Sequence, residues 1–141
     1  GLQMEKWDYK QLDIVSDITS IPEKDGSFDV VLCTEVLEHV PDPVAALKEM
    51  LRLIKPGGLL ILTAPFCSIT HFAPFHFGTG FNRYFYEHHL PAHGFSIEEL
   101  QQNGNYFMIM IFQKEVLVIL LFKKMDLLLL IHKIKILLII K

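Results

Sequence analysis

The stretch Ser27–Pro43 reads SFDVVLCTEVLEHVPDP and changes character twice along its length. Residues 28–33 are an apolar run broken only by Asp29, which is typical of a strand covered on both faces of a parallel sheet. Polar residues follow the run. Asp42 is then suited to cap a helix, and Pro43 fits a first helical turn. The stretch therefore predicts a buried strand, a turn that presents polar side chains, and the start of a helix.

A helix and a second strand are expected directly after this stretch. The apolar positions of the helix recur at spacings of three and four residues, as on one helix face: Val44, Leu47, Leu51 and Ile54. Pro56-Gly57-Gly58 predicts the end of the helix, and residues 59–65 form a second apolar run. Strand, helix and strand in this order make a βαβ unit, which implies a parallel pair. A short apolar–polar alternation at residues 12–16 predicts a further strand in the same sheet.

Residues 66–94 interrupt this pattern and hold five of the seven histidines of the chain, together with many aromatic residues. We predict a long loop over residues 66–82, because prolines and glycines punctuate it, and a short helix over residues 83–93. Residues 95–102 fit either a capped helix or a strand, and their pattern alone leaves both open.

The composition of the 141-residue chain suits one domain, and its 51% of hydrophobic residues suffices for a core. Residues 1–115 carry 8 Lys and Arg against 15 Asp and Glu, a net charge of −7, which argues against a nucleic-acid surface. Residues 116–141 carry five Lys and one Asp, a net charge of +4, and 19 of these 26 residues are apolar. Charged residues interrupt that tail before an apolar run reaches the ~18–20 residues of a membrane span.

The two cysteines, Cys33 and Cys67, are not in a C-x-x-C pair. Each lies in or beside an apolar run, so we expect two buried, reduced thiols and a reducing compartment, the cytoplasm. The first residue is Gly1, and no charged-then-apolar signal segment follows it. We therefore expect a truncated form or an internal piece of a longer domain.

Two segments in combination, FDVVLCTEVLEHVPDP at residues 28–43 and LIKPGGLLILTAPF at residues 53–66, resemble class I S-adenosylmethionine-dependent methyltransferases, in particular the type 11 methyltransferase domain family. The resemblance covers residues 12–107 and implies an α/β fold, a partial Rossmann-like parallel sheet with flanking helices. The glycine-rich loop with which this family approaches its cofactor has no match upstream of Asp17. We accordingly divide the chain into a leader at residues 1–11, the C-terminal part of a methyltransferase domain at residues 12–107, and a tail at residues 108–141 that is not native to the family.

The resemblance implies methyl transfer from S-adenosylmethionine to an unidentified acceptor, a small molecule or another. The alternative is a non-catalytic fragment stabilised by a partner or by self-association through the tail. The residues alone do not distinguish an active methyltransferase from a non-catalytic fragment.

Cofactor contacts are implied at two strand ends. Asp17 matches the family's aspartate that accepts a hydrogen bond from the adenine amino group, and the backbone of Ile18 matches the residue that receives a ring nitrogen. Thr34 and Glu35 match the loop that closes over the methionyl end of the cofactor. From the residues alone, Asp17 is also explained as an ordinary turn cap.

No catalytic residue is assigned, since methyl transfer requires alignment and exclusion of water more than a particular side chain. His39 matches the family's histidine in its LEHV signature, where it faces the substrate or packs structurally. Further candidates for the acceptor pocket or for a base are His71, His76, Tyr84 and His88.

The spacing of the histidines predicts no metal site. His71 and His76 are five residues apart in a loop, and His89 and His93 are four apart on the expected helix. The position after His89 is Leu90, whereas the zinc-binding H-E-x-x-H pattern has a glutamate there. We expect these side chains to belong to the core or to a pocket.

Overall fold

A computed structural model describes residues 12–102, 116–122 and 136–140. Its elements in chain order are strand β1 (Phe28–Thr34), the 3-10 helix η2 (Leu37–His39), helix α1 (Pro43–Leu53), strand β2 (Ile54–Pro65), helix α2 (Arg83–Ala92), and strands β3 (Glu99–Gln102), β4 (Val116–Phe122) and β5 (Ile136–Ile140). The leader predicted at residues 1–11 lies outside the described residues. The proposed division of the chain at residue 107 stays a prediction.

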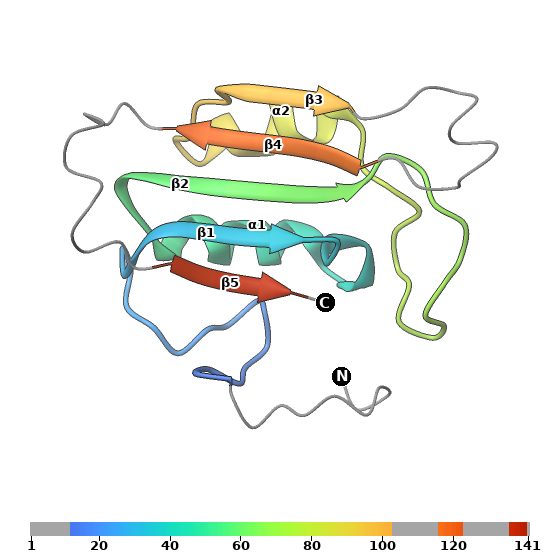
Figure 1. The fold of residues 1–141 in the computed structure, drawn as a ribbon, viewed down its shortest axis with the longest axis horizontal. Coiled ribbons are helices and arrows are strands. Elements are labelled where there is room, and N and C mark those ends of the chain that lie inside the picture. The colour runs from blue at the N-terminus through green and yellow to red at the C-terminus, as the bar shows by residue number, and fades with distance from the viewer. Residues whose placement is uncertain (1–11, 103–115, 123–135, 141) are drawn as a thin grey trace.

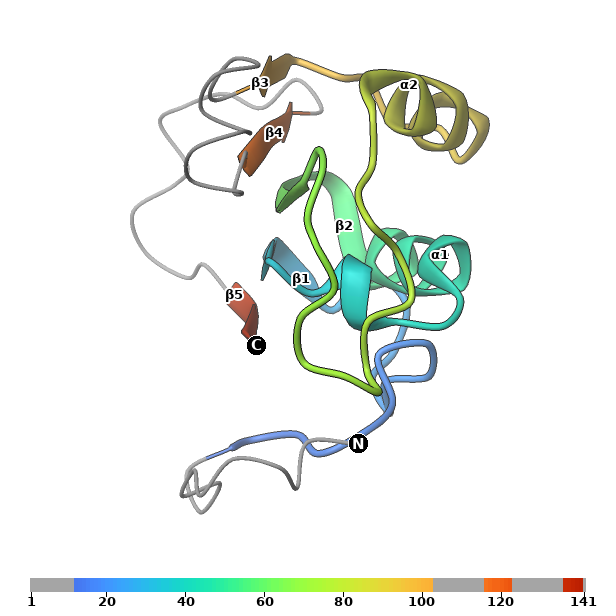
Figure 2. The ribbon, with the colours of Figure 1, turned by 90° about the vertical axis from the view of Figure 1, so that its right-hand side faces the viewer.

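The described strands form one sheet in the order β3-β4-β2-β1-β5 (Figure 1). Strand β1 pairs in parallel with β2 on one side and with β5 on the other. Strand β4 runs antiparallel to both β2 and β3. Helices α1 and α2 lie on the same face of this sheet (Figure 2). The α/β class and the Rossmann-like parallel sheet with flanking helices are thus confirmed, with β4 as an antiparallel addition.

The βαβ unit predicted from Ser27 onward is present as β1, α1 and β2. Asp42 caps α1, since its Oδ1 accepts a hydrogen bond from Ala45 N at 2.9 Å. The helix ends at Leu53, and β2 begins at Ile54, earlier than the predicted residue 59. Ile54 therefore belongs to the strand and not to the helix face.

Gly58 explains how β2 can begin so early. The pairing register shifts between Phe28, which faces Ile54, and Val30, which faces Leu59, so the intervening residues of β2 bulge out of the ladder. A Cβ atom at Gly58 would lie 2.6 Å from Ile54 Cγ2 and 2.7 Å from the carbonyl oxygen of Asp29. Only glycine lets the bulge pack this closely against β1.

The strand predicted at residues 12–16 is wrong. These residues contain no strand, and Leu12 and Val15 are 54% and 80% exposed. The single pairing nearby is an isolated bridge between Asp17 and Ser20. The position beside β1 is occupied by β5, and a five-residue alternation is too weak a signal to outweigh that competition.

The second half of the described region follows the expectations more closely. Residues 66–82 are a loop without helix or strand, and α2 covers the helix predicted at residues 83–93. Asn82 caps α2 by accepting a hydrogen bond from Phe85 N at 3.2 Å. The ambiguous segment 95–102 contains strand β3, which starts only at residue 99. Among the described residues, we find no helix whose length and apolarity would let it span a bilayer.

The core lies where the two helices cover the sheet. Most of the largest side chains that are completely buried come from α1, β2 and α2: Leu47, Met50, Leu53, Leu60, Leu62, Tyr86 and Leu90. The others are Leu37 and Glu38 of η2. Burial of each aliphatic side chain of this size contributes roughly 1.5–3 kcal/mol relative to an exposed position. This packing fixes the position of β1, whose carboxyl end carries the candidate site.

Arg52 on α1 holds the segment that precedes β1. Its guanidinium donates to Glu49 Oε1 at 2.8 Å and to Asp25 Oδ1 at 2.6 Å. It also donates to the carbonyl oxygens of Ile21 and Glu23 at 3.1 and 2.8 Å. Glu49 in turn accepts a hydrogen bond from Ile21 N at 2.7 Å. One side chain therefore joins the segment at residues 21–25 to helix α1.

We expect Arg52→Ala to lower the free energy of unfolding by about 2 kcal/mol, because partly buried acceptors lose a charged donor. Arg52→Lys should recover less than half of this loss, since an ammonium group cannot reproduce the planar fork. Urea unfolding monitored by circular dichroism measures both. Equal stability of the three proteins would contradict the assigned role.

The loss of stability at acidic pH tests the same contact between Arg52 and Glu49. The hydrogen bond from Arg52 holds the pKa of Glu49 below its ordinary value of 4.5. The stabilisation by this pair is therefore complete above that pH and disappears as the pH falls through the lowered folded-state pKa. In Glu49→Gln this part of the decrease in the free energy of unfolding at low pH should be absent.

Candidate active site at the carboxyl end of β1

Thr34 and Glu35 lie at the carboxyl end of β1, where ligands bind in open parallel sheets. Thr34 is the last residue of the strand and pairs with Thr63 on β2 and with Ile140 on β5. Glu35 N donates to the carbonyl oxygen of Thr63 at 3.0 Å, and Glu35 Oε1 accepts from Thr63 Oγ1 at 3.1 Å. These bonds fix both the backbone and the carboxylate of Glu35 against β2.

Two strained backbone positions border this site. Among the described residues, Glu35 and Phe72 are the non-glycine residues with positive φ, at 52° and 54°. A left-handed conformation costs a residue with a side chain roughly 1–2 kcal/mol, and such strain concentrates at functional sites. The strain therefore lies at the end of β1 and in the loop that packs beside it.

The loop at residues 66–82 folds back onto η2. The backbone N–H groups of Phe77 and Gly78 both donate to the carbonyl oxygen of Glu38, at 2.8 and 3.1 Å. His39 Nδ1 donates to the carbonyl oxygen of Phe75 at 2.5 Å. The loop is therefore held directly beside the turn that follows β1.

Three of the five residues predicted for the acceptor pocket meet in this place. The ring centroids of His39 and His71 are 4.9 Å apart, those of His71 and His76 are 4.6 Å apart, and those of His39 and His76 are 6.0 Å apart. Tyr84 is 70% exposed on α2, and His88 is also exposed on that helix. The structure thus brings together His39, His71 and His76 and leaves Tyr84 on a solvent-facing part of α2.

Asp17 lies in an exposed turn. Its Oδ1 accepts hydrogen bonds from Thr19 N at 2.8 Å and from Thr19 Oγ1 at 2.6 Å, as expected of a turn cap. The bond from the Thr19 hydroxyl is also the main cause that holds the pKa of Asp17 below its ordinary value. The following residue, Ile18, is half-buried and packs against the core. The roles predicted for both residues toward adenine stay predictions.

Glu38 is the residue that sequence reasoning missed. Its side chain is only 1% exposed, and its Oε1 lies 3.4 Å from His39 Nε2. A buried carboxylate is costly unless positive charge compensates it. The sequence EH at residues 38–39 was the available signal, but a charged residue in a turn is ordinarily exposed, so the pattern alone did not indicate its burial.

The carboxylates also act on Cys33, which is buried on β1. Burial is the largest cause that raises the pKa of the Cys33 thiol to about 12, and the negative charges of Glu38 and Glu35 add to it. Cys67 is exposed, so the expectation that both thiols are buried is wrong for Cys67. It follows the last residues of β2 and already belongs to the surface loop.

We expect a thiol reagent such as iodoacetamide to modify Cys67 and spare Cys33 in the folded protein at pH 8. The reason is that the thiolate is the reacting form, and Cys33 is both inaccessible and neutral at this pH. Mass spectrometry should find one adduct per native chain, two after denaturation, and none on native Cys67→Ser. Rapid modification of Cys33 in the folded protein would contradict its burial beside the negative charges of Glu38 and Glu35.

Residues 3–62 match the family model described as "Methyltransferase domain". Over 41 residues the chain is 58% identical to the ubiquinone biosynthesis O-methyltransferase of Xanthomonas oryzae pv. oryzae; the match covers 29% of this chain and 17% of that enzyme. The chain thus spans about a sixth of the length of this relative.

Solved structures share the fold. A SAM-dependent methyltransferase from Methanosarcina mazei has a TM-score of 0.59 at 21% identity, over 79% of this chain and 66% of that one. A Haemonchus contortus phosphoethanolamine N-methyltransferase, in complex with phosphomonomethylethanolamine and S-adenosylhomocysteine, has a TM-score of 0.58 at 12% identity, over 77% and 36% of the two chains.

The chain shares the Rossmann-like fold of these solved methyltransferases. Residues 3–62, which include β1, α1 and most of β2, are thus similar to a methyltransferase domain.

Proposed function

We propose that this protein transfers a methyl group from S-adenosylmethionine to a hydroxyl group of a small molecule, and that the carboxyl end of β1 holds the cofactor. The observation that carries the proposal is Glu35, a strained glutamate directly after a parallel strand, fixed against β2. The Xanthomonas relative is an O-methyltransferase, which favours a hydroxyl acceptor. These matches favour an enzyme over the alternative of a non-catalytic fragment.

The residues present fit this cofactor by charge. S-adenosylmethionine carries a positive sulfonium and an ammonium group, and the carboxylates of Glu35 and Glu38 lend the strand end a negative field. The hydroxyl of Thr34 adds a donor and acceptor beside them. Asp17 is ionised at neutral pH, and its Oδ1 accepts both bonds from Thr19. Its Oδ2 can therefore accept a hydrogen bond from the adenine amino group. The cofactor, when bound, supplies the activated methyl group.

The role of this chain's residues is then to bind, orient and exclude water. Glu35 would orient the amino-acid end of the cofactor, and Asp17 and Ile18 its adenine. The loop at residues 66–82 would cover the acceptor, with His39, His71 and His76 along its inner side. A histidine there is suited to accept the proton that the acceptor hydroxyl loses.

Calorimetric titration of S-adenosylmethionine into the purified chain tests the cofactor assignment. We expect saturable binding, weakened at least tenfold in Asp17→Ala and in Glu35→Gln, since each loses a charged partner worth about 1.4 kcal/mol or more. His39→Ala should still bind the cofactor. Asp13→Ala, a change at an exposed aspartate close to Asp17, is the matched control.

The circular dichroism spectrum of each variant must match that of the parent chain for these comparisons to hold. No saturable binding by the folded parent chain would overturn the proposal for this polypeptide. Equal loss in Asp17→Ala and Asp13→Ala would overturn the adenine assignment alone.

A further inference from the structure

We propose that Tyr86 on α2 is a further cofactor-binding residue, whose hydroxyl donates a hydrogen bond to the carboxylate at the amino-acid end of S-adenosylmethionine. This inference rests on the proposed function and adds a contact from the helix layer to a site at the strand ends. Among the described residues, Tyr86 is the largest side chain that is completely buried. Its ring centroid lies 5.2 Å from that of Phe85 and 6.5 Å from that of Phe81.

The hydroxyl of Tyr86 is unsatisfied. Within the described part of the chain it has no hydrogen-bond partner. A buried hydroxyl ordinarily has one, because an unpaired polar group is desolvated without compensation. A phenylalanine would fill the same space without this cost. The hydroxyl therefore lowers the stability of the fold, as groups do that serve a binding site at the expense of stability.

The hydroxyl is influenced by the charged groups at the carboxyl end of β1. Burial is the main cause that raises the pKa of Tyr86, and the negative charges that Cys33, Glu38 and Glu35 carry when ionised add to it. Cys33 is on β1, and the two glutamates belong to the turn that follows the strand. At neutral pH the phenol is protonated, so it is available to this site as an uncharged hydrogen-bond donor.

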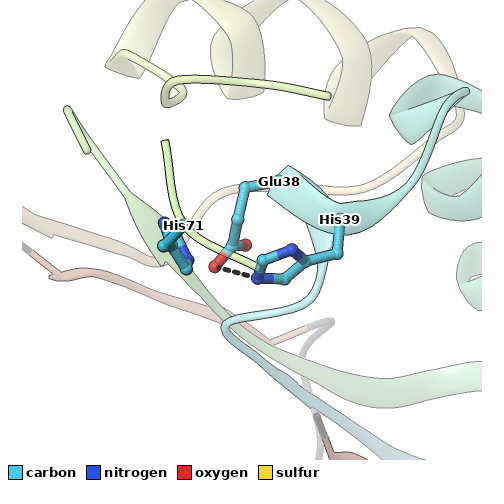
Figure 3. A group of neighbouring side chains, drawn as sticks. All are labelled: Glu38, His39 and His71. Atoms are coloured by element: carbon cyan, nitrogen blue, oxygen red, sulfur yellow. Dashed lines mark ion pairs between the residues drawn. The ribbon is translucent and has the colours of Figure 1, made fainter. Parts of the chain in front are cut away.

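The surrounding charges limit what this donor can bind. Glu38 is 1% exposed, and its carboxylate lies between the rings of His39 and His71 (Figure 3). Glu35 adds a second carboxylate to the same strand end. A simple anion would be repelled by these two charges, so a suitable ligand brings its acceptor oxygen together with a positive charge. An α-amino acid does so, because its carboxylate and its ammonium group are attached to one carbon.

S-adenosylmethionine ends in such an α-amino acid. If Glu35 binds the ammonium group from the strand end, the neighbouring carboxylate can accept a hydrogen bond from Tyr86 in the helix layer. Two contacts to substituents of one carbon fix the direction of the chain that leads to the sulfonium. They thereby help to orient the methyl group toward the acceptor.

Access to Tyr86 requires movement of a neighbouring segment, because its side chain is completely buried. The end of the loop is that neighbour. A Cβ atom at Gly78 would lie 3.4 Å from Phe81 Cζ and 3.8 Å from Glu38 Cα, so the loop packs between the aromatic cluster and η2. Gly78 N donates to the carbonyl oxygen of Glu38 at 3.1 Å. Binding of the cofactor at Tyr86 is therefore coupled to a shift of this loop.

Tyr86→Phe removes the hydroxyl alone and tests the contact in two measurements. Without ligand, we expect a melting temperature higher than that of the parent chain by roughly 3 °C or more, because an unpaired buried hydroxyl is gone. In calorimetric titrations, S-adenosylmethionine and S-adenosylhomocysteine should bind the variant at least tenfold more weakly. Methylthioadenosine shares the adenosine and the neutral sulfur of S-adenosylhomocysteine but lacks the amino-acid end, so it should bind both proteins equally.

Tyr84→Phe is the matched control, since Tyr84 is on the same helix and 70% exposed. It should have the melting temperature and the affinities of the parent chain.

An unchanged or lower melting temperature of Tyr86→Phe would show that the hydroxyl is paired and would overturn the inference, whatever the titrations give. Unchanged affinity for S-adenosylhomocysteine, or an equal loss for methylthioadenosine, would overturn the contact with the carboxylate and leave the proposed function standing. Absence of S-adenosylmethionine binding by the folded parent chain would instead overturn the proposed function, and this contact with it.

Discussion

Gly80→Ala should cost at least about 4 kcal/mol of folding free energy, enough to unfold most of the population at 25 °C. Gly80 has a φ of 150°, in a region that residues with a side chain rarely adopt. An added Cβ would lie 2.1 Å from the carbonyl oxygen of Phe66 and 2.4 Å from its carbonyl carbon. Both are backbone atoms, which cannot rotate away as the end of a side chain would.

The backbone around Gly80 has no freedom to retreat. Phe81 N donates to the carbonyl oxygen of Pro65 at 2.9 Å, and Ser68 N donates to that of Thr79 at 2.6 Å. The chain at both sides of the glycine is therefore tied to the end of β2 and the start of the loop. Any protein that folds despite the change must displace the loop at residues 66–82, together with His71.

Gly78→Ala is the matched control, in the same loop and with the same added methyl group. The nearest atom to its new Cβ is Phe81 Cζ at 3.4 Å, an ordinary contact, so we expect a change below about 1 kcal/mol. Urea unfolding of both variants and the parent chain measures the difference. Similar stability of Gly80→Ala and Gly78→Ala would contradict the described path of the loop.

Proline substitutions in β5 should be the second most damaging changes, and only at alternate positions. Leu137 and Leu138 of β5 pair with Val31 and Leu32 of β1. Successive N–H groups along a strand point to opposite sides, so one of these two residues directs its N–H toward β1 and the other directs it outward. We expect one proline variant to lose at least about 2 kcal/mol and the other to lose markedly less.

Leu137→Ala and Leu138→Ala separate the side-chain contribution, since both keep the N–H group. Loss of β5 would open the edge of β1, and an unpaired edge favours association with another chain. Light scattering should therefore show a mass that rises with concentration only for the damaging proline variant. Equal, small effects of both prolines would mean that β5 does not pair with β1 in solution.

The sequence predicted the β1-α1-β2 unit because each part had a strong local signal. Residues 28–33 and 59–65 are continuous apolar runs, and Asp42 with Pro43 marks the start of the intervening helix. Sequence analysis placed the end of this helix too late, since the bulge at Gly58 depends on contacts with Asp29 across the sheet. Such tertiary contacts override local propensity at element boundaries.

Local sequence patterns do not show whether residues 12–16 or β5 pairs with the edge of β1. Both segments carry an apolar pattern, and the continuous apolar run of β5 is the one that pairs with β1. The meeting of Glu38 and His71 was equally hidden, because the two lie far apart in the chain. It depends on the loop hydrogen bonds to η2, which leave no periodic trace in the sequence.

Chemical-shift mapping of the isotope-labelled chain with S-adenosylmethionine tests the central claim most directly. We predict that the backbone amide signals of Asp17, Ile18, Thr34 and Glu35 shift with a single saturating dissociation constant. The amides of α2 at residues 87–90 should stay unchanged. Shifts confined to α2, or no shift at the carboxyl end of β1 with the fold intact, would contradict a cofactor site at this edge of the sheet.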